Sequence, residues 1–137
     1  MSCVLDNSVA MRWFFESPKA SDNTYALAVR KEIEKGLQSI VPPIFMYEAG
    51  NIFIKMGKAI DDTIQSLRAL QAMVKEPAYS QALVFESARL ASQYKLTTYE
   101  ASYLALAMFT TSSIASLDTD MVKAARKMGI AITGATL

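Results

Sequence analysis

Histidine is absent from this 137-residue chain, and its absence removes several kinds of chemistry. Ser-His and Cys-His nucleophile pairs, paired-histidine nuclease chemistry and most zinc sites all need an imidazole. Cysteine occurs once, at Cys3, which excludes an internal disulfide and a thiolate metal cluster. We therefore expect any hydrolysis to depend on carboxylates and a hard metal ion, and Cys3 to pack within a strand.

Long apolar stretches, repeats, linkers and a strong net charge are missing as well. No stretch approaches the roughly 18 apolar residues of a membrane helix, and the start lacks a basic region followed by an apolar one, so we expect a cytoplasmic protein that binds no membrane. The net charge of +1 excludes the strongly basic profile of a non-specific nucleic-acid coat protein, but it is compatible with a local basic rim. The length predicts a single domain, residues 1–137.

Short apolar runs alternate with helical patterns along the chain. Strands are predicted at 2–5, 38–41, 113–117 and 130–133. Helices are predicted at 6–15, 21–36, 44–57, 61–76 (capped by Asp61 or Asp62), 79–94, 98–110 and 118–129. This order predicts an α/β fold with three αβα layers, in which helices cover both faces of a small central parallel sheet.

Two aspartates directly follow predicted strands. Asp6 comes after residues 2–5 and Asp118 after residues 113–117. Each residue, taken alone, is explained as a helix N-cap. In a parallel sheet, however, the carboxyl ends of the strands meet at the edge where ligands bind, so both carboxylates are expected there.

A third acid, Glu48, interrupts the apolar helix IFMYEAGNIFI. An unpaired buried carboxylate costs several kcal/mol, so a buried Glu48 needs a cation. Asn51, three residues later, shares its helix face and is a candidate to orient the carboxylate or a bound water. The alternative is that Glu48 faces solvent or pairs with Lys55 or Lys58.

A fourth acid, Glu100, follows Thr97 by three residues, a spacing that fits a capping box as well as a functional site. A chain without histidine that gathers acids at one sheet edge favours a site for Mg²⁺ or Mn²⁺, because hard cations prefer oxygen ligands. The candidate ligands are Asp6, Glu48, Glu100 and Asp118.

The blocks VLDNSV, YEAGNI, TTYEASYLALA and SLDTDMVKAARKMGI together resemble the PIN domain, above all the toxin ribonucleases of VapBC-type toxin–antitoxin pairs. The resemblance covers nearly the whole chain, although residues 61–94 match only in pattern. It implies that the four acids hold the metal, with Ser8 and Asn51 as supporting residues and Asp120 as an additional acid. The third block usually has aspartate, and the extra methylene of Glu100 moves its carboxylate by about one carbon–carbon bond.

The resemblance also implies an activity: a metal-dependent endoribonuclease that hydrolyses RNA phosphodiester bonds with one or two Mg²⁺ or Mn²⁺ ions and leaves 5′-phosphate and 3′-hydroxyl ends. Since four carboxylates repel a polyanion, the metal and nearby cations must attract the RNA backbone. The candidate cations, each otherwise an ordinary solvated charge, are Arg12, Lys55, Lys58, Lys123 and Arg126. Base stacking or partner binding is open to Trp13, Phe14 and Phe15, but we expect at least two of them to pack in the core.

Partners are suggested by the hydrophobic share of 52%, which favours an apolar surface covered by another copy or a partner. The resemblance implies a homodimer and an antitoxin protein. The alternative from another class is a catalytically decayed PIN-like binding module, with Glu100 as the mark of decay, which acts through protein or RNA partners. A receiver-like phosphotransfer domain is a weaker alternative, because no suitable lysine follows a strand and Glu48 lies within a helix.

Overall fold

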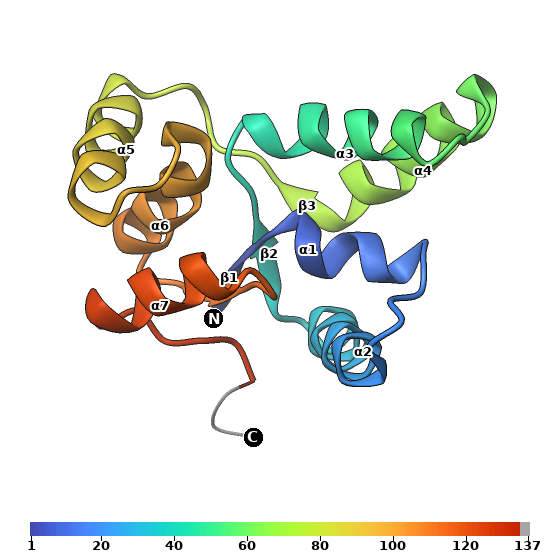
Figure 1. Cartoon of the computed structure of the whole chain (residues 1–137), viewed down its shortest axis with the longest axis horizontal. Coiled ribbons are helices and arrows are strands. Elements are labelled where there is room, and N and C mark those ends of the chain that lie inside the picture. Colours follow the sequence, from blue (N-terminus) through green and yellow to red (C-terminus); the bar gives the residue numbers. More distant parts are fainter. Residues whose placement is uncertain (135–137) are drawn as a thin grey trace.

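A computed structural model of the chain describes residues 1–134 and shows strands and helices in alternation (Figure 1). The strands are β1 (Ser2–Leu5), β2 (Gln38–Ile40), β3 (Val74–Lys75) and β4 (Ser113–Ala115). The helices are α1 (Asn7–Ala10), the 3₁₀ turn η1 (Met11–Trp13), α2 (Ala20–Glu34), α3 (Ile44–Lys55), α4 (Ile60–Met73), α5 (Gln81–Tyr94), α6 (Thr98–Thr110) and α7 (Thr119–Lys127). None of these helices is long and apolar enough to span a membrane.

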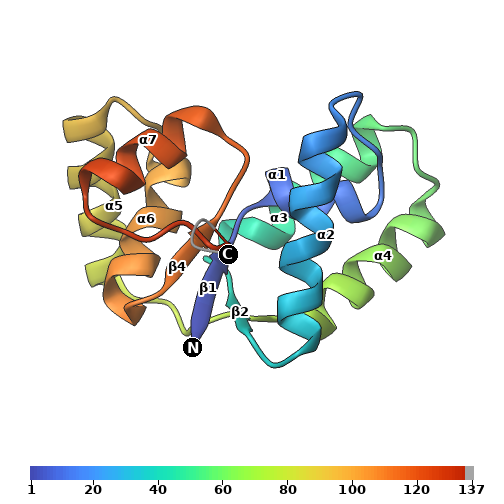
Figure 2. The same ribbon diagram turned by 90° about the horizontal axis from the view of Figure 1, so that it is seen from below.

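The four strands form one parallel sheet in the order β3-β2-β1-β4. Figure 2 shows the sheet between two helical layers, with α5, α6 and α7 on one side and α1 to α4 on the other. The predicted three-layer αβα fold with a small parallel sheet is therefore confirmed. Because helices cover both faces, β1 is buried, and its residues Cys3, Val4 and Leu5 are fully inaccessible to solvent.

The predicted last strand, 130–133, is wrong as a strand. Only Ile132 pairs with the sheet, through a single bridge to Ile114. Gly129 and Gly134 flank this stretch with φ values of 74° and 78°, so the chain turns on both sides and leaves little extended backbone. In the opposite direction, the two-residue β3 was not predicted, because two residues give no periodic signal.

Helix ends agree with the predicted capping chemistry at some positions and disagree at others. Thr97 and Glu100 form the capping box at the start of α6, and Gly36, with φ of 119°, follows the end of α2. At α4 the predicted cap is wrong: Ala59 holds the N-cap position, and the two aspartates lie in the first turn, where they still favour the positive end of the helix dipole.

The three aromatic residues after α1 pack as the sequence predicts for at least two of them. Phe14 contacts Phe53 of α3 edge to face with ring centroids 5.0 Å apart, and Phe15 contacts the same ring at 6.0 Å. Trp13 donates its indole N–H to the carbonyl of Ala26 at 2.8 Å. The turn after β1 is thereby fixed between α2 and α3, and this fixes the start of α1 beside the sheet.

Candidate active site

The strand order reverses at β1, because β2 and β3 lie on one side of it and β4 on the other. In open parallel sheets, ligands bind at this reversal, beyond the carboxyl ends of the two strands. Asp6 is the first residue after β1, and Asp118 follows β4 by three residues. The two aspartates therefore lie where the topology alone places a site.

Asp6 does not cap α1: its carboxylate makes no capping hydrogen bond, and the side chain is 8% exposed. Instead its Oδ2 accepts hydrogen bonds from the hydroxyls of Ser8 at 2.6 Å and Ser116 at 2.8 Å. The same serine oxygens accept the backbone N–H of Leu117 at 2.8 Å and of Asp118 at 3.0 Å. The carboxylate, two hydroxyls and two amides thus join the ends of β1 and β4 in what we call the serine clamp.

The Asp6 carboxylate carries an electrostatic cost in this position. Burial raises its pKa, the neighbouring charge of Asp118 raises it further, and the two serine hydrogen bonds lower it. Within residues 1–134, no lysine or arginine forms an ion pair with Asp6. A buried carboxylate without a cation favours binding of a positive ion.

Glu48 of α3 points into the same region and is half-buried. Its Oε1 accepts a hydrogen bond of 2.5 Å from the hydroxyl of Tyr103, a residue of α6 that is 1% exposed. Burial raises the pKa of Glu48, the Tyr103 hydrogen bond lowers it, and the charges of Asp6 and Glu100 raise it. No ion pair with Lys55 or Lys58 is present among the described residues, so the alternative of a lysine-paired Glu48 is not realised.

Asn7 connects Glu48 to the strand that carries Asp6. Its Nδ2 donates to the carbonyl of Phe45, in the first turn of α3, at 3.0 Å. Burial raises the pKa of Glu48 and of Tyr103, and the Asn7 amide lowers both. Its buried Oδ1 has no hydrogen-bond partner in the part of the chain that the structure describes.

Glu100 and Asp118 both serve as helix caps in this conformation. Oε1 of Glu100 accepts the backbone N–H of Thr97 at 2.9 Å. Oδ1 of Asp118 accepts the N–H groups of Asp120 at 2.9 Å and Met121 at 3.2 Å. Their ordinary explanation as caps is therefore borne out, and each keeps a second carboxylate oxygen that makes no hydrogen bond within residues 1–134.

Electrostatic effects link the four acids in pairs, and we call this series the row of acids. Asp118 affects the pKa of Asp6, and Glu48 is affected by both Asp6 and Glu100. Among the described residues, however, no three acidic, cysteine or histidine side chains lie close enough to hold one ion together. The donor chemistry fits Mg²⁺ or Mn²⁺, since all the ligands are oxygens and such ions keep several waters of their own.

The remaining predicted residues are Asn51, Asp120 and the five candidate cations. Asn51 is exposed on α3 and makes no hydrogen bond with Glu48 within the described chain, and Asp120 is exposed in the first turn of α7. Lys58 lies over the rings of Phe14, Phe15 and Phe53 at 5.7 to 5.9 Å. The other candidate cations are at least partly exposed: Arg12, Lys55, Lys123 and Arg126.

Three polar residues that touch the acids were not assigned a role in the site from sequence. Ser116 lies inside the predicted strand SIASL, Tyr103 lies inside the apolar run ASYLALA, and Asn7 was considered only as a helix cap. Ser116 and Tyr103 each break an apolar segment with a hydrogen-bonding group, whereas Asn7 lies between the polar residues Asp6 and Ser8. That break was the available signal, and it is the same signal that singled out Glu48.

One family model matches the chain from within β1 to the end of α7. The family model described as PIN domain matches residues 3–127, which include all four acids. Among curated proteins, no match to the chain was found.

Solved structures give the same fold at low identity. The chain is similar to one in the crystal structure of VapBC2 from Rickettsia felis bound to a DNA fragment from their promoter, with a TM-score of 0.71, 12% identity, and coverage of 96% of this chain and 97% of that one. It is also similar to a chain in a toxin-antitoxin complex from Klebsiella pneumoniae, with a TM-score of 0.64, 19% identity and coverage of 85% and 87%. A third similar chain, in FitAcB from Neisseria gonorrhoeae, has a TM-score of 0.60, 14% identity and coverage of 96% of each chain.

We expect Asp6→Asn to raise the melting temperature in EDTA at neutral pH, by an amount equivalent to a few kcal/mol, because it removes a buried charge and keeps an oxygen for the serine hydroxyls. Burial raises the pKa of Asp6, so ionisation of this carboxyl destabilises the folded state at neutral pH. At a pH low enough to protonate the carboxyl in both the folded and the unfolded state, Asp6 has no such effect. The difference from wild type should therefore shrink as the pH falls toward the usual value of 3.8. Thermal melts across pH measure it, with exposed Glu16→Gln as the control; a lower melting temperature for Asp6→Asn at neutral pH would contradict the account.

Tyr103→Phe removes only the hydroxyl that donates to Glu48, so we expect the pKa of Glu48 to rise further. Carboxyl carbon chemical shifts of Glu48 across a pH titration measure this directly. The matched control is Tyr25→Phe, which removes a hydrogen bond of 2.7 Å to the carbonyl of Thr133 and should leave Glu48 unchanged. An identical Glu48 titration in wild type and Tyr103→Phe would show that the hydroxyl does not act on the carboxylate.

Proposed function

Because the chain belongs to the PIN domain family, whose members are generally nucleases, we propose that it is a cytoplasmic, metal-dependent endoribonuclease and the toxin of a toxin–antitoxin pair. The observation that carries the proposal is the buried Asp6 carboxylate, which has no balancing cation among the described residues and adjoins Glu48 and Asp118 at the reversal of strand order. A structural cap needs none of these features. Neighbouring carboxylates without a balancing cation suit a site that binds a positive ion.

Four acids are proposed to hold the metal: Asp6, Glu48, Glu100 and Asp118. Mg²⁺ or Mn²⁺ held by these acids would activate a water and neutralise charge that develops on the phosphate. The chain's own contribution is positional: the serine clamp fixes Oδ2 of Asp6, and the Tyr103 hydroxyl fixes Oε1 of Glu48. These contacts leave the other oxygen of each carboxylate available to a ligand.

Glu100 is the acid whose position fits least well. Its Oε1 is held by the N–H of Thr97, so it must turn or use its second oxygen to contribute. Its charge nevertheless affects Glu48, which supports a place beside the centre. The decayed binding module remains the competing function, and it is separated from the nuclease by cleavage rather than by geometry.

We propose an antitoxin partner because of what the similar structures are named. One of them is named as a toxin-antitoxin complex, from Klebsiella pneumoniae, and another as VapBC2 from Rickettsia felis. At 19% and 12% identity they show the fold of this chain, and the partner is carried over as part of our proposal only.

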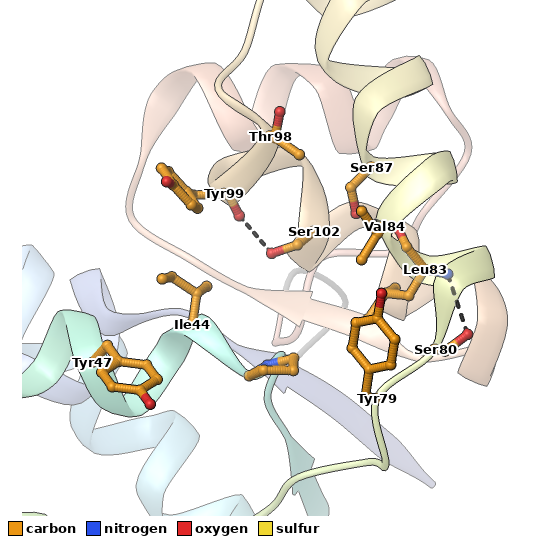
Figure 3. Close-up of a pocket in the computed structure, with 11 residues that line it drawn as sticks. Ile44, Tyr47, Tyr79, Ser80, Leu83, Val84, Ser87, Thr98, Tyr99 and Ser102 are labelled. Atoms are coloured by element: carbon orange, nitrogen blue, oxygen red, sulfur yellow. Dashed lines mark hydrogen bonds between the residues drawn. The ribbon is translucent and has the colours of Figure 1, made fainter.

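A homodimer is proposed on a separate observation, an apolar pocket of about 310 Å³ between the start of α3, α5 and the start of α6 (Figure 3). Tyr47, Tyr79 and Tyr99 surround it with exposed rings, and no charged residue lines it. In a symmetric dimer the same patch faces itself, so an uncharged surface meets its copy without like charges in contact. We propose that a second copy of the chain covers this pocket.

The nuclease is tested by incubating a structured RNA pool with the purified chain in Mg²⁺, in Mn²⁺ and in EDTA. We expect metal-dependent cuts, which Asp6→Asn reduces by more than about 100-fold, because a single lost electrostatic contact to a reacting group is worth that much. Calorimetry with Mn²⁺ supplies a second readout, in which Glu48→Gln should bind more weakly. Equal Mn²⁺ affinity would remove Glu48 from the site, and absence of both cleavage and metal binding would favour the decayed module.

For the dimer, Tyr79→Asp should convert it to a monomer of 15.1 kDa, because two copies of the new charge would meet across the symmetric interface. We expect the dissociation constant to rise by roughly 100-fold or more, as measured by light scattering after size exclusion. Phe109→Asp is the matched control, since Phe109 is also an exposed aromatic on α6 but does not line the pocket. Dissociation by the control alone would place the interface elsewhere.

A further inference from the structure

Three lysines converge on one cavity that none of the assignments above uses. Lys95, Lys123 and Lys127 line a space of about 270 Å³ between the turn that joins α5 to α6 and the outer face of α7. In Figures 1 and 2, α7 lies beside α6, on the side of the sheet that carries α5. The cations that the sequence singled out include Lys123 but neither Lys95 nor Lys127, and Lys95 is remote from both along the chain.

The cavity carries an excess of positive charge. Asp120 is its only acidic lining residue, against three lysines. None of the three lysines forms an ion pair within residues 1–134. Like charges around one cavity repel, and a bound anion relieves that repulsion. The composition therefore fits an anionic ligand with more than one negative charge.

Lys95 has a backbone conformation that its own side chain disfavours. It is the C-cap of α5, with φ of 56° and ψ of 46°, in the left-handed region where glycine is the usual residue. A residue with a Cβ is strained there, so the position would be more stable as glycine. Such strain is a reason to look for a function of the side chain, and here the side chain lines the lysine cavity.

The cavity adjoins the row of acids on two sides. Asp120 lies two residues beyond Asp118, in the first turn of α7. Leu96, another lining residue, precedes Thr97, whose backbone N–H is bonded to Glu100. The starts of α6 and α7, which carry Glu100 and Asp118, therefore border the lysine cavity. A polyanion that places one phosphate at the acids would bring a neighbouring phosphate to the lysines.

We propose that Lys95, Lys123 and Lys127 bind backbone phosphates of the RNA strand next to the one that is cleaved. This inference rests on the proposed nuclease function and adds to it the path that the strand takes. Lysine suits the role because it acts as a point charge that contacts phosphates without reading bases. The proposal also distinguishes the two candidate cations on α7, since Lys123 lines the cavity and Arg126 does not.

The test measures how salt weakens RNA binding. Each phosphate contact on a single strand contributes about 0.7 to the slope of log affinity against log salt concentration. In an Asp6→Asn background, which prevents cleavage, changing all three lysines to glutamine should reduce that slope by about 2. The matched control changes Lys19, Lys31 and Lys75 to glutamine, three exposed lysines outside the cavity, and should leave the slope unchanged.

A single substitution separates a binding role from a structural one. We expect Lys95→Gly to raise the melting temperature by a few degrees, because it relieves the left-handed strain, and to weaken RNA binding roughly two- to fivefold at low salt. Thr111→Gly is the control: Thr111 is the C-cap of α6 with φ of 51°, at the end of that helix remote from Glu100. It should become more stable without any change in RNA affinity.

Each other outcome overturns the inference. If wild type cleaves RNA and the triple variant keeps the wild-type slope, the lysine cavity is not on the strand's path while the nuclease stands. If wild type neither binds nor cleaves RNA, the proposed function fails first and this inference with it. If a polyglutamate peptide binds with the same lysine-dependent slope as RNA, the cavity is a site for acidic protein segments instead.

Discussion

The serine clamp around Asp6 is the contact on which the rest of the site depends. A carboxylate placed between two buried strands needs hydrogen-bond donors, and the chain supplies two hydroxyls whose oxygens are themselves held by backbone amides after β4. That arrangement fixes the ends of β1 and β4 relative to each other. It also fixes Asp118, because one of those amides is its own.

The second half of the site is attached to the first by Asn7 and Tyr103. Asn7 follows Asp6 in the chain and bonds the first turn of α3, so the position of Glu48 is set from β1. Tyr103 reaches Glu48 from α6, which lies on the opposite side of the sheet from α3. Four elements that are distant in sequence therefore position two carboxylates, and the cost of holding these charges together is met by hydrogen bonds rather than by cations of the chain.

The elements with a periodic local pattern were predictable from the sequence, whereas contacts between residues far apart in the chain were missed. Alternation of apolar runs and helical patterns was enough for the parallel sheet, because buried strands and capped helices leave local signals. The same reasoning placed Asp6 and Asp118 at one edge, but it gave a full strand at 130–133, where only Ile132 pairs with the sheet. Ser116 and Tyr103 were missed because their partners lie far away in the chain. The spacing of Thr97 and Glu100 fitted a capping box as well as a functional site, and the observed bond between them confirms the capping box, while the ligand role predicted for Glu100 stays a prediction.

The distance along the chain between Asp6 and Ser116, 110 residues, has a consequence for synthesis. During synthesis Asp6 leaves the ribosome 110 residues before Ser116, the serine that completes its surroundings. Contacts of such long range form late in folding, because the intervening loop must first close. A nascent or truncated chain that stops before β4 carries Asp6 without its clamp, so any activity of this site would require that β4 and Ser116 have been made.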